Sequence, residues 1–163
     1  MTDEQFWSLI EQARGGLPES ADSHRLTAVL RPFGNDEISA FGLMFYEKIC
    51  DLNDWRLWGA GYVIAGGMSD DSFHYFRSWI IGKGRRVFDL ARTNPDALGP
   101  DIDDQDVDNE ALEYACLDLL EERGVTQDPR DKASRAADGK PSGAAFDEGK
   151  VQTAFPKLHA LFG

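Results

Sequence analysis

The sequence predicts an all-α protein: a single compact multi-helix domain with a flexible loop before a docked C-terminal helix. Apolar residues recur at spacings of three and four in at least five segments, and no segment alternates between apolar and polar residues as a half-buried strand does. The 163 residues suit one domain, and ten Phe with four Trp suffice for a sizeable core. We therefore expect helices around one core, and no β-sheet.

The first part of the chain predicts three helices. Thr2 is expected to cap the first, because Gln5 completes a capping box, and a diglycine ends this helix. A weaker pattern predicts a second helix over 22–30. The third begins at Asn35 or Asp36 and has the clearest helical spacing. Its apolar face consists of Ile38, Phe41, Phe45, Ile49 and Leu52.

The middle of the chain predicts three more helices. Asp54 is expected to cap a helix over 55–65, which apolar residues nearly encircle, so we expect it to lie at the centre of the fold. Ser69 is expected to cap the next helix. A short helix over 85–92 then ends before Pro95, since residues that precede proline avoid helical geometry.

The last part of the chain divides into three pieces. The core is expected to span residues 1–124, and its last helix begins at Asp108 or Asn109. Residues 127–144 contain no large apolar side chain and predict a flexible loop. Residues 145–163 are too apolar for a free tail and are expected to dock on the core. The apolar residues of this closing segment are Phe146, Val151, Phe155, Leu158, Leu161 and Phe162.

Residues 55–98 carry the most distinctive string, WRLWGAGYVIAGGMSDDSFHYFRSWIIGKGRRVFDLARTNPDAL. This string resembles the bacterial family called domain of unknown function 4240, whose pattern WxLWGAxYxxxGGxSDDxFxYFRxWLIxxGR is intact here except for Ile80, where Leu is commoner. Three further segments resemble the family's opening and closing parts: DEQFWSLIEQAR, EALEYACLDLLEERG and AFPKLHALF. The loop over 127–144 resembles an insertion before the closing part.

The resemblance implies a fold and no activity. Members sometimes sit beside a WGR domain, a module found with nucleic-acid-associated proteins, but the chain has no WGR-like segment. The resemblance therefore assigns no catalytic residue.

Charge excludes several classes of partner. The chain has 17 basic and 29 acidic residues, a net charge of −12, and residues 1–124 hold 24 of the acidic residues and 11 of the basic ones. Phosphates repel such a protein, so direct binding to nucleic acid or to an anionic membrane is not expected. No apolar run reaches the roughly 18 to 20 residues that span a bilayer, and the N-terminus lacks a signal peptide, so we expect a soluble cytoplasmic protein. Cys50 and Cys116 lie in apolar helical patterns and predict buried thiols, and we expect no metal and no cofactor.

The densest polar group lies at the start of the helix that Ser69 caps. Asp70 and His74 are four residues apart on one helical face, where a carboxylate and an imidazole form an acid/base pair if a cleft encloses them. Arg77 would then hold an anion. The alternative is structural: acids in a first turn stabilise the helix dipole, and Arg77 pairs with a carboxylate. The candidate binding residues are Trp58, Asp70, Asp71, His74 and Arg77.

The second candidate surface is an acidic face formed by Asp103, Asp104 and Asp106. A calcium loop that starts at Asp104 fails, because Asn109 occupies the glycine position and Ala115 the glutamate position. The diglycine after residue 65 lacks the lysine of a phosphate-binding loop, and no HExxH or GxSxG motif is present. A basic cluster, Lys83, Arg85, Arg86 and Arg92, either compensates the nearby acids or binds a small anion.

Three functional hypotheses follow. The leading one is a non-enzymatic regulatory or immunity-type module that binds a basic protein partner through the acidic face. The competing one is a small-molecule-binding domain or enzyme, with a pocket between the helices over 55–65 and 69–81. A nucleic-acid mimic that presents carboxylates in place of phosphates is the third. The sequence indicates no oligomeric state and no particular reaction.

Overall fold

The computed structural model describes all 163 residues and contains nine α-helices and three 3₁₀ helices, without a β-sheet. The α-helices are α1 (Asp3–Arg14), α2 (Ser23–Leu30), α3 (Asn35–Asp51), α4 (Trp55–Ala65), α5 (Asp70–Gly82), α6 (Arg85–Thr93), α7 (Glu110–Glu122), α8 (Val151–Ala154) and α9 (Pro156–Phe162). The 3₁₀ helices are η1 (Pro95–Asp101), η2 (Pro129–Lys132) and η3 (Glu148–Lys150). The predicted all-α class is confirmed.

Local capping explains where the helices begin. The hydroxyl of Thr2 accepts a hydrogen bond from the Gln5 amide, and the Gln5 side chain accepts one from the Thr2 amide, which completes the predicted capping box. Asp54 caps α4 and Ser69 caps α5, also as predicted. Gly15 ends α1 with a φ of 61°, a left-handed conformation that favours glycine.

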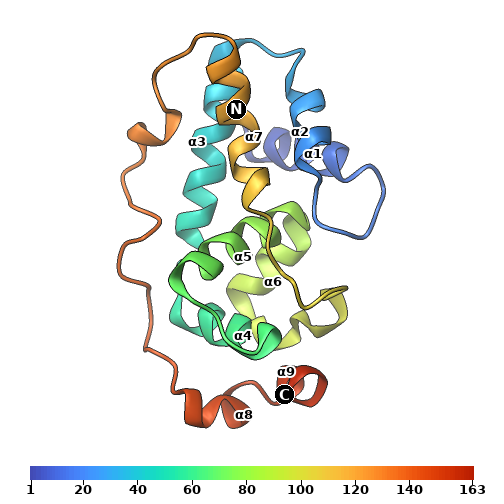
Figure 1. Ribbon diagram of the computed structural model, residues 1–163, viewed down its shortest axis with the longest axis vertical. Helices are drawn as coiled ribbons and strands as arrows, with labels where there is room; N and C mark the ends of the chain where they lie inside the picture. The colour runs from blue at the N-terminus through green and yellow to red at the C-terminus, as the bar shows by residue number, and fades with distance from the viewer.

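The helices form two groups along the long axis of the molecule. Figure 1 shows α1, α2, α3 and α7 at one end, α4, α5 and α6 below them, and α8 with α9 beyond α4. In the first group α7 packs against α2 and α3, and α1 packs against α2. Helix α5 joins the groups, because it contacts α3, α6 and α7.

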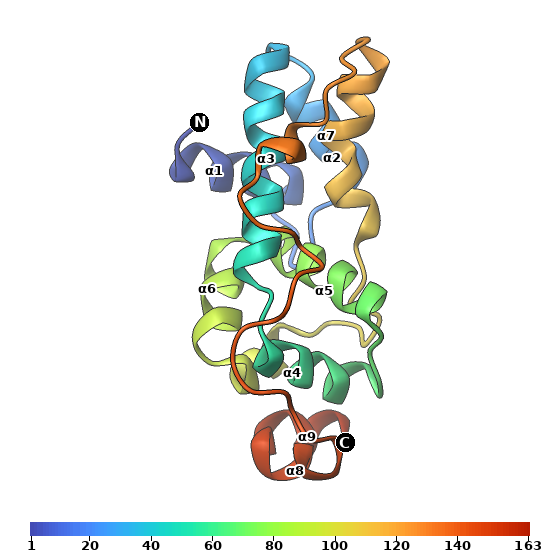
Figure 2. The ribbon, with the colours of Figure 1, turned by 90° about the vertical axis from the view of Figure 1, so that its left-hand side faces the viewer.

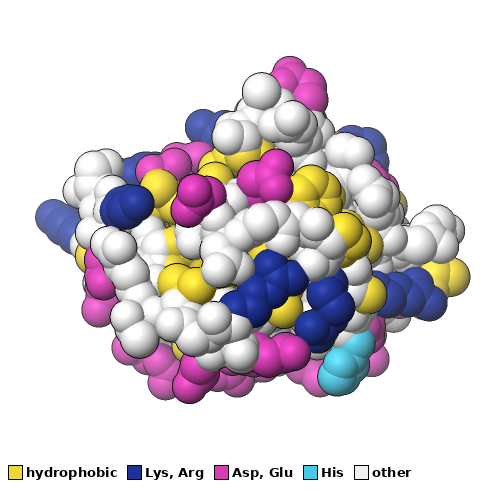
Figure 3. Space-filling view, turned by 90° about the horizontal axis from the view of Figure 1, so that it is seen from above, with side chains coloured by type: hydrophobic (Ala, Val, Ile, Leu, Met, Phe, Trp, Pro, Cys, Tyr) yellow, Lys and Arg dark blue, Asp and Glu magenta, His cyan; other side chains and the backbone are white.

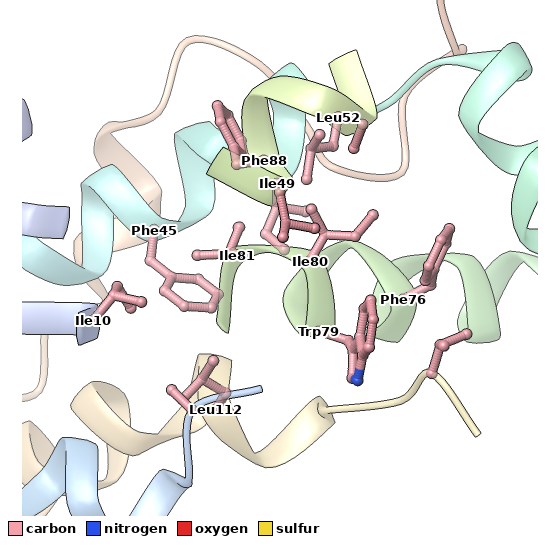
Figure 4. Packing of buried hydrophobic residues seen from close by; sticks show 14 of the residues in the cluster. Ile10, Phe45, Ile49, Leu52, Phe76, Trp79, Ile80, Ile81, Phe88 and Leu112 are labelled. Atoms are coloured by element: carbon pink, nitrogen blue, oxygen red, sulfur yellow. The ribbon is translucent and has the colours of Figure 1, made fainter. Parts of the chain in front are cut away.

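One apolar core of 36 buried residues connects all of these helices except α8, which has no buried residue. Figure 4 shows side chains of α3, α6 and α7, among them Phe45, Phe88 and Leu112, around Ile80 and Ile81 of α5. Helix α5 is thus the centre of the fold, and residues 76–84 are all buried.

The sequence-based expectation that 55–65 would be the central helix is wrong. One stripe of α4, which carries Trp55, Trp58 and Tyr62, stays half-buried. The opposite side of α4 is buried, but this stripe faces the chain's C-terminal part, whose Phe146 covers it from one side. The apolar residues around α4 therefore reflect packing against the closing segment, residues 145–163, and do not place α4 at the centre of the fold.

Residues 127–144, which we call the tail, run from the end of α7 along α3 towards α4, as Figure 2 shows. The segment has no long helix, yet hydrogen bonds hold it in several places. The Ala137 amide donates to the Tyr46 hydroxyl at 2.9 Å, the Asn53 side chain donates to the Gly139 carbonyl at 2.8 Å, and the Ser142 amide donates to the Asn53 carbonyl at 2.9 Å. The predicted loop is therefore anchored along its length, and its flexibility stays a prediction.

Limited proteolysis checks that prediction. Lys132 and Lys140 are exposed and form no ion pair, whereas Arg135 binds Asp51. We expect trypsin to cut first after Lys132, because few contacts protect the chain there. The bond after Lys140 is not a site, since Pro141 follows it and trypsin does not cleave Lys–Pro bonds. Mass spectrometry of the first fragments identifies the sites, and early cuts within 55–81 would contradict this expectation.

The closing segment lies at the opposite end of the molecule from the N-terminus (Figure 1), with α9 packed against η1 and α4. Phe155 and Leu158 are buried. Phe155 and Phe146 pack against Gly59 of α4, where a Cβ atom would come within 2.8 Å of the Phe155 ring. Asp96 of η1 supplies the cap that α9 lacks, since its carboxylate accepts hydrogen bonds from two amides at the start of α9. None of the helices is long and apolar enough to cross a bilayer.

Candidate functional site

The five predicted binding residues line one pocket of about 390 Å³. Trp58, Asp70, Asp71, His74 and Arg77 share it with Tyr114 of α7 and with residues 137–141 of the tail. We call it the His74 pocket. The sequence predicts a pocket between α4 and α5. In the structure the tail forms the wall that faces α5, and only Asn53 and Trp58 come from the chain before α5.

Arg77 is fixed by backbone carbonyl groups. Its side chain is 3% exposed and donates to the carbonyls of Phe73, Ile49 and Ala137 at 3.4, 3.1 and 3.0 Å. The Ile49 carbonyl belongs to the last turn of α3, where the helix dipole favours a positive charge. Burial lowers the pKa of the guanidinium to about 10. Arg77 thus joins α5 to α3 and to the tail, and it forms no ion pair with a carboxylate.

His74 binds Glu113 and not Asp70. Its Nε2 atom lies 2.6 Å from a carboxylate oxygen of Glu113, which is 4% exposed, and the other oxygen lies 3.4 Å from Arg130. Arg130 in turn pairs with Asp128 at 2.7 Å. Polar side-chain contacts therefore run from His74 on α5 through Glu113 on α7 to Arg130 and Asp128.

The predicted acid/base pair of Asp70 and His74 is not formed. Asp70 is exposed in the first turn of α5, and its carboxylate accepts a hydrogen bond from the Asp71 amide at 3.0 Å. Glu113 was not predicted as a site residue, because it is 39 residues from His74. One signal was present in the sequence: Glu113 follows the inward-facing Leu112 on α7. A carboxylate that is buried at such a position needs a polar partner.

Two rings of a three-ring stack, those of Trp58 and Phe73, line one side of the His74 pocket. The rings of Trp55 and Trp58 have centroids 5.0 Å apart, those of Trp58 and Phe73 are 4.8 Å apart, and both pairs are inclined by 10°. The Arg77 guanidinium lies 4.5 Å from the Phe73 ring centroid and extends the stack. The Trp58 indole also donates to the Met68 carbonyl at 2.9 Å. This side of the pocket is therefore held rigid.

The predicted acidic residues line a second hollow of about 490 Å³. Asp103, Asp104 and Asp106 are exposed there, and the segment between α1 and α2 lies opposite them. The carboxylates are those of Glu19, Asp22, Asp103, Asp104, Asp106 and Asp108, and the cations are Arg14 and Arg25. We call it the acidic hollow. Glu19 and Asp22 were not predicted as part of this surface, because no spacing rule connects two loops so far apart in the chain.

The basic cluster is largely neutralised by acidic residues. Lys83 pairs with Asp103 at 3.3 Å, and Arg86 pairs with Asp101. Arg85 lies 3.7 Å from an oxygen of Asp3. These contacts favour the first of the two interpretations of the cluster, which is charge compensation.

A third hollow, of about 570 Å³, was not predicted. It lies between α1 and the start of α3, and we call it the α1–α3 groove. Residues Met1, Glu4, Gln5, Ser8, Leu9 and Gln12 line it from the α1 side, and Phe33, Asp36, Glu37 and Ala40 line it from the α3 side. The helical spacing within α1 was visible in the sequence, but its position beside α3 was not.

Both cysteines are buried, and the structure contains no cluster of side chains that could hold a metal ion. Cys50 and Cys116 are buried free thiols, and burial raises both pKa values, that of Cys116 to about 12. A thiol with a raised pKa is a poor nucleophile. No three potential ligands converge as a metal site would need.

A family model described as protein of unknown function (DUF4240) matches residues 1–122 of the 163-residue chain. The family expected from the string at 55–98 is therefore confirmed. The match ends before the tail that walls the His74 pocket. Neither a curated protein nor a solved structure matches the chain.

Proposed function

The chain belongs to the DUF4240 family of proteins of unknown function, and we propose that it is a protein-binding module that recruits a basic partner through the acidic hollow. The observation that supports this proposal is a surplus of carboxylates in one concave surface. Six carboxylates and two guanidinium groups line the acidic hollow. A cleft lined by charges of one sign concentrates the field and attracts groups of the opposite sign.

Most of these carboxylates have no cation of their own. Asp103 pairs with Lys83, whereas the other five form no ion pair within the chain. Asp22, Asp104 and Asp108 instead accept hydrogen bonds from nearby backbone amides. Their charge is thus oriented but not neutralised, which suits Lys and Arg side chains of a partner.

Association kinetics test this function. Replacing Asp104 and Asp106 together with Asn is expected to lower the association rate by about tenfold at 0.01 M salt, since electrostatic steering accounts for 10- to 1,000-fold. Adding Asp103→Asn should lower the rate further. The wild-type rate should itself fall as the Debye length shrinks from about 30 Å at 0.01 M to about 10 Å at 0.1 M salt. The measurement is surface plasmon resonance with a partner captured from native lysate.

The double variant is the safer one to test. Asp103 is the ion-pair partner of Lys83, which is 5% exposed, so its loss also affects the fold. Asp118→Asn with Glu121→Gln is the matched control, because it removes two exposed carboxylates from α7. The proposal would be refuted if the association rate changed neither with the salt concentration nor with the double substitution.

The His74 pocket supports a second candidate, a small-molecule-binding or enzymatic function. The observation that favours it is the convergence of five predicted residues on one pocket. His74→Ala or Asp70→Asn would then abolish ligand binding or turnover, while the changes in the acidic hollow would have little effect. Thermal-shift screening of wild type against His74→Ala distinguishes the two functions, since a ligand of this pocket stabilises wild type alone.

A further inference from the structure

We propose that the α1–α3 groove seats a basic amphipathic helix of a protein partner. The inference rests on the proposed function for the basic character of that partner, and it assigns a different surface from the acidic hollow. The shape of the groove, its apolar floor and its charge support this assignment.

The shape suits a helix. Glu4, Ser8 and Gln12 are four residues apart on α1, so they form one wall along a single helical face. The nine residues from Glu4 to Gln12 span roughly 12 Å, because eight steps separate them at about 1.5 Å each. Asp36 and Ala40, four residues apart on α3, form the other wall. A groove between two helices is a common seat for a third, which places its apolar face inward.

The floor of the groove is apolar and incompletely covered. Leu9 lies at the floor and is 5% exposed, whereas Phe33 is half-buried and Met1 is 41% exposed. Met1 is one of four large apolar side chains that stay exposed on the whole molecule. A partner that covered Phe33 and Met1 would remove apolar surface from water, which favours binding.

The charge of the groove selects the sign of the partner. Glu4, Asp36 and Glu37 line it, and none of its ten lining residues is Lys, Arg or His. None of these three carboxylates forms an ion pair within the chain. Figure 3 looks onto this end of the molecule, where apolar side chains lie beside carboxylates and beside Lys or Arg side chains. An apolar face flanked by Lys and Arg complements this surface, and an acidic helix does not.

Two other occupants fit less well. The chain's own closing segment packs against η1 and α4, at the far end of the molecule (Figure 1), so it does not fill the groove. A second copy of the chain would bring a net charge of −12 to a groove that already holds three carboxylates. A basic partner avoids this repulsion.

A synthetic peptide tests the proposal with the full-length protein. The probe has 18 residues, with Leu on one helical face and Lys or Arg on the other. One control peptide has the same composition in scrambled order, and a second carries Glu in place of the basic residues. Fluorescence anisotropy at 0.1 M salt should show saturable binding of the probe, at least tenfold weaker binding of the scrambled peptide, and no binding of the acidic one.

Variants of the protein locate the site. Ser8→Arg adds bulk and positive charge to an exposed position in the wall, and it should weaken binding of the probe at least tenfold. Gln12→Lys is a second variant of the same wall. Ala28→Arg, on an exposed position of α2, is the matched control and should leave the dissociation constant within about twofold of wild type. Circular dichroism confirms that each variant is folded.

The outcomes separate this inference from the proposed function. Equal binding of the probe and the scrambled peptide would overturn the groove proposal. So would binding that Asp104→Asn with Asp106→Asn abolishes while Ser8→Arg leaves it unchanged, because the probe would then occupy the acidic hollow. If the groove variants weaken the probe while the acidic-hollow variants leave the native partner's association rate unchanged, the groove proposal stands and the proposed function fails.

Discussion

Replacing Arg77 with Ala is expected to lower the free energy of unfolding by about 3–5 kcal/mol. A hydrogen bond from a charged group contributes about 1.5–3 kcal/mol, and the contributions of neighbouring bonds are not additive. The substitution removes three such bonds and leaves the carbonyls of Ile49 and Ala137 without this donor in a buried site. It also opens a cavity beneath the tail. Urea unfolding followed by Trp fluorescence measures the change.

A conservative variant and an exposed control sharpen this test. Arg77→Lys keeps the charge, but one ammonium group cannot reproduce the fork that reaches three carbonyls, so we expect an intermediate loss. Arg92→Ala removes an exposed guanidinium that lies 5.5 Å from the Phe88 ring centroid, and it should change stability by less than about 1 kcal/mol. An unfolding midpoint for Arg77→Ala equal to that of wild type would show that Arg77 does not hold the tail.

The same substitution bears on the His74 pocket. Arg77 binds the Ala137 carbonyl, and residues 137–141 form the pocket wall opposite α5. Loss of Arg77 should therefore open the pocket and speed tryptic cleavage after Arg135, which lies two residues before Ala137. A structural role for Arg77 and a ligand-binding role for His74 are thus separable, because His74→Ala leaves the hydrogen bonds of Arg77 in place.

Local features of the fold were predictable from the sequence because their causes are local. The capping box of Thr2 and Gln5 involves residues three positions apart, and Asp54 and Ser69 cap helices within two or three residues of themselves. The helical class follows from apolar spacing within single segments. The family string gave the relationship directly, because it lies within one continuous stretch of the chain.

The sites were less predictable because their contacts join distant segments. His74 and Glu113 meet across 39 residues, and nothing in either segment identifies the other. The sequence offered two partners for Arg77, an anion and a carboxylate, but its partners in the structure are backbone carbonyls, which have no sequence signature. For the same reason the anchors of residues 127–144 were not predicted, because they include backbone groups that composition does not reveal.

Truncation after Gly143 is expected to lower the free energy of unfolding by about 3–6 kcal/mol. Burying Phe155 and Leu158 contributes about 1.5–3 kcal/mol each, and both are fully or almost fully buried against the core. A single substitution isolates the main contact: Phe155→Ala should cost about 3–5 kcal/mol, because Gly59 has no side chain that could fill the cavity. Leu161→Ala, on a side chain that is 62% exposed, is the matched control and should cost less than about 1 kcal/mol. Differential scanning calorimetry of the three variants measures the effect, and a melting temperature for the truncated chain that equals that of wild type would mean that residues 144–163 do not stabilise the core.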